Sequence, residues 1–541
     1  MYGYELIARQ LVAEGVDTVF AVMGDGNLHL LAELGLTHGI RIVHARHEQG
    51  AVSMADGYSR FTGQLGVATV THGPGMTNTA TSLATAVAHR SRVLLIVGGL
   101  AAHDVDNLQQ LDQSAFAASL GADRVALTTP SRVGADLDRA LRIVLNGRRT
   151  VVLDAATDIQ TAETGITTIR SGETRITASA PAPSRELAEQ AARILGAAKR
   201  PIIVAGRGAS SNDAISAIGK LAVAIGAPVV TSLLGKGNFS SHPNSLGVAG
   251  GLGDPAASHT LATADCVLSI GASLNDWTTT RKDFVTDATI IQIDVDPLAF
   301  GRFVDPALAI LSDAACAALA ITEYIVPSAP PLSWRPPARD SAGDDLEYDD
   351  GANTVDPRRA CLAIENALPR DRAVVVDGGH ACIWGAQLVQ THMPRSFTHG
   401  FSFGSIGQSL SLALGAAAGL NGRRVAAIMG DGSAAMSIAE LETAVRENLP
   451  VAIVVLNDGG FGIERHTLAL QNLPVAESNY PSPNFADLAR AAGASAITVS
   501  SVEDLSLIPQ LLQESGPVLI DLRVNGGLIA DTFLEIKQLH R

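Results

Sequence analysis

The sequence has few aromatic residues, few cysteines and no long apolar run. Of its 541 residues, 4% are aromatic and 4 are cysteines, none of them in a CxxC pair. Isolated cysteines predict neither a disulfide framework nor a zinc site, and they leave a reducing cytoplasm as the expected location. The sequence lacks the roughly 18 consecutive apolar residues that a membrane span needs. Residues 1–15 are typical of an amphipathic helix rather than a signal peptide, so we expect no membrane partner.

The sequence also lacks an excess of positive charge. It has 39 Lys and Arg against 54 Asp and Glu, a net charge of −15, which argues against nucleic acid as a partner. Its 47% hydrophobic and 17% charged residues indicate a folded chain rather than a disordered one. The 52 glycines suit an α/β protein with many tight strand-to-helix turns.

Apolar runs rich in β-branched residues alternate with helical patterns along the whole chain, which predicts parallel sheets covered by helices on both faces. Two stretches, 156–185 and 326–356, lack this alternation and are predicted to be solvated linkers. We therefore predict an α/β fold with three doubly wound, mostly parallel-sheet domains, at 1–165, 186–325 and 357–541, since the length also suggests about three domains. The predicted strands are 18–24, 41–47, 66–73, 93–99, 150–155, 201–208, 228–233, 266–273, 289–297, 373–379, 425–432, 451–460 and 517–524.

The residues Met-Gly-Asp-Gly occur twice, and the later copy ends an apolar strand. A helical pattern over 433–448 follows it. This places Asp431 at the carboxyl end of a strand and Ser433 near a helix N-terminus, positions where α/β sheets bind ligands and anions. The next strand ends at Asn457, so the two side chains are expected side by side. With the carbonyl of Gly459 and phosphate oxygens they would form an octahedral Mg²⁺ site; the alternative is two ordinary turns in which Asp and Asn are caps.

This Gly-Asp-Gly with its distant Asn resembles the signature of the thiamine diphosphate (ThDP) enzymes. The resemblance implies that Asp431, Asn457 and the Gly459 carbonyl bind Mg²⁺. It also implies that Gly432 and Ser433 lie near the diphosphate of the cofactor.

Two upstream segments extend the resemblance. "DGGHACIW" resembles the family segment that meets the diphosphate from the other side, which implies a role for Gly379 and His380. "HGFSFGSIGQSLSLALGAA" resembles the stretch that carries a bulky residue under the cofactor. That residue would be Ile406, which bends the cofactor, while backbone atoms of Gly404 and Ile406 meet its aminopyrimidine ring. Taken alone, Ile406 is an ordinary core residue.

The first domain supplies a carboxyl group in "IVHARHEQGAVSMADGYSR". Glu48 follows a strand and begins a helix in which Ala51, Val52 and Ala55 lie on the same face as Glu48. An unpaired charge on such an apolar face is costly, and charges placed in this way are common at functional sites. The alternative is a helix-start glutamate favoured by the helix dipole. The segment resembles the family pattern, which implies that Glu48 meets the pyrimidine nitrogen of ThDP and activates the cofactor.

The resemblance covers nearly the whole chain, in the order pyrimidine-binding, middle and diphosphate-binding domain. "THGPGMTNT" and the middle-domain segments "AIGAPVVTSLLGKGN" and "IIQIDVDP" are similar to those of acetolactate synthases. The resemblance implies a homodimer in which Glu48 and Asp431 meet across the subunit interface, often paired into a homotetramer.

Several positions differ from the acetolactate synthases. His72 stands where those enzymes carry a small residue, and it resembles benzoylformate decarboxylase-like enzymes. Asp25, in the first Met-Gly-Asp-Gly, and Glu464, in "GFGIER", resemble the proton-transferring carboxyls of pyruvate decarboxylase-like enzymes. Gln109 and Gln110 resemble a substrate-lining glutamine of acetolactate synthases.

Each of these residues has an ordinary structural alternative. Asp25 can cap the following helix, His72 can be a hydrogen-bonded turn residue, and Glu464 can pair with Arg465 or a Lys at the surface. One of the two glutamines is expected at the surface.

Together these resemblances imply a ThDP- and Mg²⁺-dependent enzyme that decarboxylates a 2-oxo acid and transfers the resulting acyl carbanion to a carbonyl acceptor. Asp25, His72 and Glu464 are the candidates for proton transfer. The alternatives are a simple decarboxylase that releases an aldehyde, and a catalytically silent subunit with this fold. Whether FAD binds in the middle domain stays open. Loops 204–211 and 242–253 resemble dinucleotide- and flavin-binding loops only weakly, which favours the absence of FAD.

Overall fold

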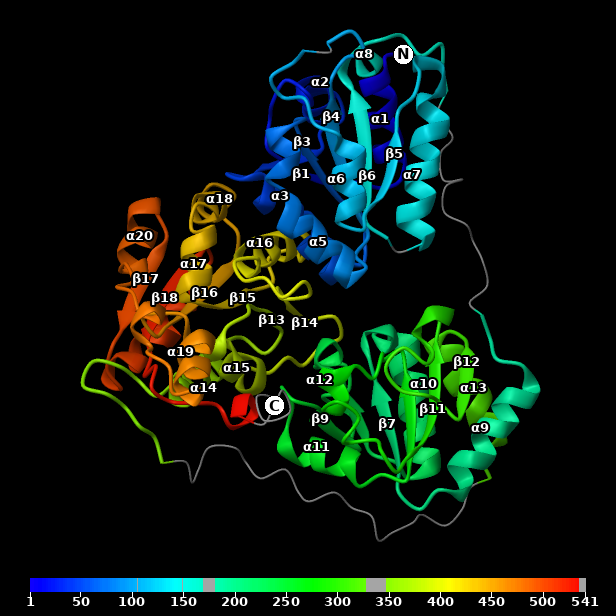
Figure 1. The fold of residues 1–541 in the computed structure, drawn as a ribbon, viewed down its shortest axis with the longest axis vertical. Coiled ribbons are helices and arrows are strands. Elements are labelled where there is room, and N and C mark those ends of the chain that lie inside the picture. The colour runs from blue at the N-terminus through cyan, green and yellow to red at the C-terminus, as the bar shows by residue number, and fades with distance from the viewer. Residues whose placement is uncertain (105, 148, 169–180, 327–346, 535–541) are drawn as a thin grey trace. The chain divides into compact units, whose positions relative to one another are not determined.

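The structure is a computed structural model, in which the described residues are 1–104, 106–147, 149–168, 181–326 and 347–534. It contains three sheets of six strands, each associated with helices, which confirms the predicted α/β class (Figure 1). The chain divides into two compact units. One contains the first sheet and most of the third, and the other contains the second sheet.

The first sheet has the strand order β2-β1-β3-β4-β6-β5, and its neighbouring strands are parallel. Every residue of β3 and β4 is buried, as expected for strands covered on both faces. The strands are β1 Thr18–Ala21, β2 Arg41–His44, β3 Gly66–Val70, β4 Val93–Gly99, β5 Asp123–Ala126 and β6 Val151–Ala156. The helices are α1 Gly3–Ala13, α2 Leu28–Ala32, α3 Glu48–Thr62, α4 Pro74–Thr77, α5 Ala80–His89, α6 Gln113–Ser119, α7 Val133–Gly147 and α8 Thr157–Gln160.

The second sheet has the order β12-β11-β10-β7-β8-β9 and is also parallel. Its strands are β7 Pro201–Ala205, β8 Val229–Thr231, β9 Ser245–Val248, β10 Cys266–Ile270, β11 Thr289–Asp294 and β12 Leu308–Leu311. Its helices are α9 Arg185–Ala197, α10 Asn212–Ile225, α11 Pro255–Ala262, α12 Asp276–Thr279 and α13 Ala314–Tyr324. Alanines of α9, α10 and α13 pack on Ile and Val side chains of the strands to form one core of this domain.

The third sheet has the order β14-β13-β15-β16-β18-β17. All seven residues of β16, at the centre, are buried. The strands are β13 Ala373–Val376, β14 Phe397–His399, β15 Val425–Gly430, β16 Val451–Asn457, β17 Ser495–Val499 and β18 Val518–Arg523. The helices are α14 Pro357–Ala367, α15 His380–Leu388, α16 Ser409–Gly419, α17 Asp431–Ser437, α18 Glu440–Arg446, α19 Gly462–Leu470, α20 Phe485–Ala492 and α21 Ile508–Leu511.

Helix α3 of the first domain packs on helix α16 of the third. A side chain at Gly57 would collide with the backbone of Leu412, and one at Gly415 with the backbone of Met54. The two helices therefore approach closely because these positions are glycine. This contact brings the start of α3 to the domain that contains the later Met-Gly-Asp-Gly.

The structure corrects two details of the sequence prediction. The helical pattern over 433–448 is interrupted, because α17 ends at Ser437 and α18 begins at Glu440. The first residues of the predicted linker 156–185 are helical, as α8 shows, and residues 169–180 lie outside the described residues. Most of the second predicted linker, 327–346, also lies outside them. In the described parts of the chain, no helix has both the length and the apolar character that a membrane crossing requires.

Candidate cofactor and active site

The later Met-Gly-Asp-Gly lies where the sequence predicts. Strand β15 ends at Gly430 and α17 begins at Asp431, while the neighbouring parallel strand β16 ends at Asn457. Gly430 pairs with Leu456 in the register of these strands. The buried side chains of Asp431 and Asn457 thus stand at adjacent strand ends, at the edge where α/β sheets bind ligands.

Hydrogen bonds orient both candidate metal ligands. Asp431 Oδ1 accepts from the backbone N–H of Gly432 at 2.9 Å, and its Oδ2 accepts from the hydroxyl of Ser482. Asn457 Nδ2 donates to Asp521 Oδ1 at 3.0 Å, which leaves the amide oxygen as its coordinating atom. Oxygen donors of this kind suit Mg²⁺.

The third predicted ligand already has a backbone partner. The carbonyl oxygen of Gly459 accepts from the N–H of Tyr480 at 3.2 Å, and a carbonyl has a second lone pair for a metal. Within the described ranges, no group of three His, Cys, Asp or Glu side chains is placed to hold a metal. A cation here would therefore depend on amide and carbonyl oxygens as well as Asp431.

A second buried carboxyl, which the sequence interpretation missed, lies beside this site. Burial raises the pKa of Asp458 to about 7, with a further upward effect from Asp431 and an opposing effect from Arg465. Arg465 Nη1 lies 3.5 Å from Asp458 Oδ2. A buried carboxyl whose pKa is raised by a neighbouring carboxyl is stabilised in its charged form by a cation. The donor set thus fits a divalent cation, and the signal in the sequence was the Asp that directly follows Asn457.

The neighbouring glycines leave room for a bound group. The Cβ positions of Gly379, Gly404 and Gly430 face open space, with no heavy atom within 4 Å. Gly379 and Gly404 have φ angles of 121° and 78°, which favour glycine. The hydroxyl of Tyr480 lies 2.9 Å from the position that a Cβ of Gly432 would take, and it is buried with no hydrogen-bond partner in the part of the chain that the structure describes.

Burial and the charges of Asp431 and Asp458 raise the pKa of Tyr480 to about 12, so its hydroxyl remains a donor. An unsatisfied buried donor beside an open cradle of glycines fits a diphosphate oxygen.

His380 is the first residue of α15 and is buried. Its ring centroid lies 4.2 Å from that of His466. Burial, together with His466 and Arg465, lowers the pKa of His380 to about 3. The imidazole therefore remains neutral at physiological pH and offers a hydrogen bond rather than a charge.

The segment that carries Ile406 is pinned to the same region. The N–H of Gly407 donates to Asp377 Oδ2 at 3.1 Å and to Ser433 Oγ at 2.8 Å. The half-buried Ile406 lies against Gly378, since a Cβ there would be 3.0 Å from Ile406 Cγ2. Gly404, Ile406 and Ser433, which the resemblance places at the cofactor, are thus connected through one short loop.

Glu48 is the first residue of α3, as predicted, and is half-buried. Its Oε2 accepts a hydrogen bond from Asn78 Nδ2 at 2.9 Å. The sequence interpretation missed Asn78 because nothing in the spacing of the two residues connects them. The position agrees both with a cofactor-activating carboxyl and with a helix-start glutamate.

Glu440 holds the start of α3 from the third domain. Its Oε1 accepts from the backbone N–H groups of Arg46 and His47, both at 3.0 Å, and its carboxyl fills the space beside Gly50. Burial raises the pKa of Glu440. The sequence shows only a helical position here, so this contact with the residues that precede Glu48 was missed.

The first Met-Gly-Asp-Gly has different surroundings. A Cβ at Gly24 would lie 2.7 Å from Thr71 Cβ, and one at Gly26 2.8 Å from Thr71 Oγ1. Its glycines therefore allow the loop to pack on Thr71, whereas Gly430 of the later stretch faces open space. Asp25 Oδ1 accepts from Thr71 Oγ1 at 2.8 Å, and its Oδ2 lies 3.9 Å from His72 Nε2.

These contacts set aside two structural alternatives. The N-cap of α2 is Asn27, so Asp25 does not cap this helix. His72 is buried, yet neither of its ring nitrogens has a hydrogen-bond partner among the residues described, so its side chain is not a hydrogen-bonded turn residue.

The other residues proposed to act on the substrate are Gln109 and Gln110 in the first domain and Glu464 in the third. The backbone of Gln109 lies against Gly73, next to His72, while Gln110 is exposed. Glu464 is exposed in the first turn of α19, and no hydrogen bond or ion pair joins it to another described residue. Its predicted surface partner, Arg465, pairs with Asp458 instead.

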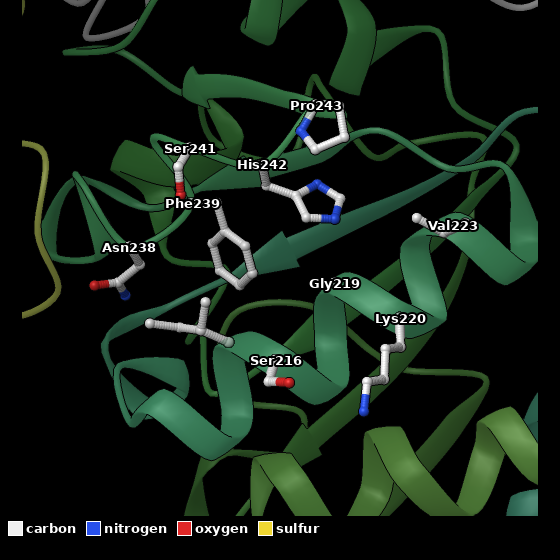
Figure 2. A pocket seen from close by; sticks show the side chains of 10 residues that line it. Ser216, Gly219, Lys220, Val223, Asn238, Phe239, Ser241, His242 and Pro243 are labelled. Carbon is white, nitrogen blue, oxygen red and sulfur yellow. The ribbon is translucent and has the colours of Figure 1, made fainter.

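The middle domain contains an open hollow of about 490 Å³ beside α10 (Figure 2). Phe239 and His242 lie along it with their rings edge to face, 6.4 Å apart. None of the residues assigned above to ThDP or Mg²⁺ lines it.

Several glycines of the two weak flavin loops allow close backbone packing. A Cβ at Gly206 would collide with the carbonyl of Gly271, and one at Gly250 with the carbonyl of Trp277. These close approaches account for Gly206 and Gly250 without a bound flavin.

Three family models match successive parts of the chain. They are the N-terminal TPP binding domain, the central domain and the C-terminal TPP binding domain of thiamine pyrophosphate enzymes, at residues 1–116, 188–321 and 377–522. Thiamine pyrophosphate is another name for ThDP.

Similar proteins match along almost the entire chain. The acetolactate synthase large subunit of Corynebacterium glutamicum is 30% identical over 97% of this chain and 87% of its own length. The sulfoacetaldehyde acetyltransferase of Castellaniella defragrans is 27% identical over 93% of this chain and 88% of its own. A solved structure, the ThDP-dependent 4-hydroxybenzoylformate decarboxylase of Rhodococcus jostii RHA1, has the same fold, with a TM-score of 0.83 and 24% identity over 97% of this chain and 99% of that one.

Proposed function

Because the chain belongs to the thiamine diphosphate-dependent enzymes of the acetolactate synthase family, we propose that it decarboxylates a 2-oxo acid and transfers the remaining acyl group to a carbonyl acceptor. The observation that carries this proposal is the similarity to acetolactate synthase large subunits over 97% of the chain. A match of this extent includes both the domain of Glu48 and the domain of Asp431.

The residues that would hold the cofactor follow from the site. Asp431, Asn457 and the Gly459 carbonyl are the proposed Mg²⁺ ligands, and Gly432 and Tyr480 would meet the diphosphate. When bound, ThDP supplies a nucleophilic carbon that adds to the keto group and takes up the electrons released as CO₂ leaves.

The remaining proposed roles belong to residues of the first domain and to loop 404–407. Glu48 would hold a proton at the pyrimidine nitrogen, with Asn78 orienting its carboxyl. Ile406 would support the bent cofactor. Asp25 and His72 would handle the substrate proton, with Gln109 beside them.

We also propose that the protein is a homodimer with shared active sites, paired into a homotetramer. The competing arrangement is an active site formed within one chain. It is suggested by Glu440, which contacts the start of α3 in the same chain. Mixing two inactive variants, Glu48→Gln and Asp431→Ala, distinguishes them. If the sites are shared, each mixed dimer has one complete site and one site that lacks both residues. A mixed dimer is then expected to regain up to about half of the activity of a native dimer. A mixture that stays inactive after subunit exchange, checked by mass spectrometry, would contradict shared sites.

Product analysis with pyruvate tests the proposed reaction. The holoenzyme, reconstituted with ThDP and Mg²⁺, is expected to release CO₂ and form acetolactate or acetoin. Acetaldehyde as the only organic product would contradict acyl transfer. A panel of other 2-oxo acids, with products identified by mass spectrometry, extends the test to other substrate side chains.

A second candidate function is simple decarboxylation with release of an aldehyde. The observation that favours it is the buried His72 beside the exposed Asp25, because a nearby acid eases protonation of the acyl group before an acceptor arrives. The third alternative, a catalytically silent subunit, requires that the protein fail to take up ThDP with Mg²⁺ present.

A further inference from the structure

Thr71 directly precedes His72 in the chain and hydrogen-bonds to Asp25, and these are two of the residues proposed for proton transfer. Its hydroxyl accepts a hydrogen bond from the N–H of Gly26 at 3.2 Å and donates one to Asp25 Oδ1 at 2.8 Å. A hydroxyl has a single proton to donate, so the direction of this bond is set. The bond fixes one oxygen of Asp25 and leaves the other, Oδ2, at 3.9 Å from His72 Nε2.

His72 is the buried member of this group and Asp25 the exposed one. The side chain of His72 is 4% exposed and that of Asp25 is 68% exposed. The other ring nitrogen, Nδ1, faces Gly26, where a Cβ would lie only 2.9 Å away. A substrate can therefore reach Asp25 but not the imidazole.

The absence of partners for the ring nitrogens within the described residues is energetically costly. An unsatisfied buried polar group destabilises the folded state, and both nitrogens of His72 are in this state. A movement of Asp25 Oδ2 by about 1 Å toward Nε2 would form a hydrogen bond of ordinary length. Thr71 determines which oxygen of Asp25 is available for that movement.

We propose that Thr71 is a positioning residue that keeps Asp25 turned toward His72, so that Asp25 exchanges a proton with the substrate and His72 renews it. The inference rests on the proposed function, and it assigns the order in which the groups act. When the acyl group is protonated, the proton leaves Asp25 Oδ2 for the substrate carbon. The resulting carboxylate then takes a proton from Nε2 of the doubly protonated His72, which becomes neutral. After the aldehyde leaves, solvent returns one proton to His72 through the exposed Asp25, so one solvent proton is consumed for each aldehyde formed.

The test compares Thr71→Val with Thr71→Ser in the full-length protein. Valine keeps the shape but removes both hydrogen bonds, while serine keeps the hydroxyl. The first measurement is the crystal structure of each variant. We expect Asp25 Oδ2 to lie beyond 5 Å from His72 Nε2 in the Val variant, a threshold of about 1 Å over the native separation, and to keep that separation in the Ser variant.

The second measurement is the ratio of aldehyde to acyl-transfer product. Because aldehyde formation needs the proton and acyl transfer does not need it at that carbon, we expect the ratio to fall about tenfold in the Val variant and to recover in the Ser variant. ThDP uptake should be unchanged in both. If the Val variant does not fold, Thr71→Ala removes the same hydroxyl with a smaller side chain.

The outcomes separate the two claims. An unchanged ratio and an unchanged Asp25–His72 separation in the Val variant would overturn the role of Thr71. A native protein that releases no CO₂ from any 2-oxo acid would overturn the proposed function, and the crystallographic separation alone would then decide whether Thr71 positions Asp25.

Discussion

A Glu48→Gln variant is expected to keep its fold and lose about a thousandfold in turnover. Glutamine retains the length of the side chain and can still meet Asn78, but it can neither accept nor return a proton. General acid–base groups contribute about 10²–10⁴ in rate, so a loss in this range is expected if Glu48 activates the cofactor. The direct measurement is hydrogen–deuterium exchange at the thiazolium carbon of bound ThDP, followed by NMR.

The matched control for this variant is Glu186→Gln. Glu186 also lies in the first turn of a helix, α9, and is exposed. It experiences a similar helix dipole, worth about 0.3–1 kcal/mol at exposed positions, without a role at the cofactor. Turnover of the control should match that of the native protein. An exchange rate for Glu48→Gln equal to the native rate would mean that Glu48 is only a helix-start residue.

An Asp431→Ala variant is expected to weaken Mg²⁺-dependent binding of ThDP by more than about 100-fold. Loss of groups that merely support metal ligands already costs about 10–100-fold in affinity, and Asp431 is proposed as a ligand itself. Asp458 would remain, but Arg465 pairs with it. Isothermal titration of ThDP into protein with saturating Mg²⁺, and again with a chelator, measures the effect.

The first Met-Gly-Asp-Gly provides the control. Asp25→Ala removes the same residue from the same four-residue sequence, but Asp25 pairs with Thr71 and lies near His72 rather than beside Asn457. ThDP and Mg²⁺ affinity should therefore be unchanged in this variant, although its turnover changes. Equal losses of affinity in the two variants would contradict the assignment of metal binding to Asp431.

The central strands of each sheet were predictable, and most edge strands were not. Strands such as β4 and β16 are buried along their whole length and appear in the sequence as continuous apolar runs. An edge strand has a neighbour on one side only, is often part-exposed and lacks this pattern, as β17 shows. The strands missed from the sequence all lie at sheet edges: β5, β9, β12, β14 and β17.

The same contrast applies to the site. Asp431 and Asn457 could be placed together because each ends a recognisable strand, and parallel neighbours bring their ends to one edge. The contacts of Glu440 with Arg46 and of Asn78 with Glu48 depend on how helices pack in three dimensions, which no spacing in the sequence records. The interruption between α17 and α18 went unnoticed for a related reason, since the apolar spacing continues across it.

The two Met-Gly-Asp-Gly stretches differ most clearly in the use of their glycines. In the first, Gly24 and Gly26 allow close packing on Thr71, and in the second Gly430 faces open space. The first stretch therefore presents Asp25 beside His72, and the second leaves room for a bound group beside Asp431.

The most direct test of the proposed function is whether cofactor-depleted protein releases CO₂ from a 2-oxo acid. The release is measured before and after addition of ThDP and Mg²⁺, and it decides whether this chain is a ThDP-dependent 2-oxo acid enzyme. We predict no release without ThDP, release when both are added to the native protein, and about a thousandfold less in Glu48→Gln. Release that is independent of ThDP, or no release from any 2-oxo acid by protein shown to have bound ThDP and Mg²⁺, would contradict it.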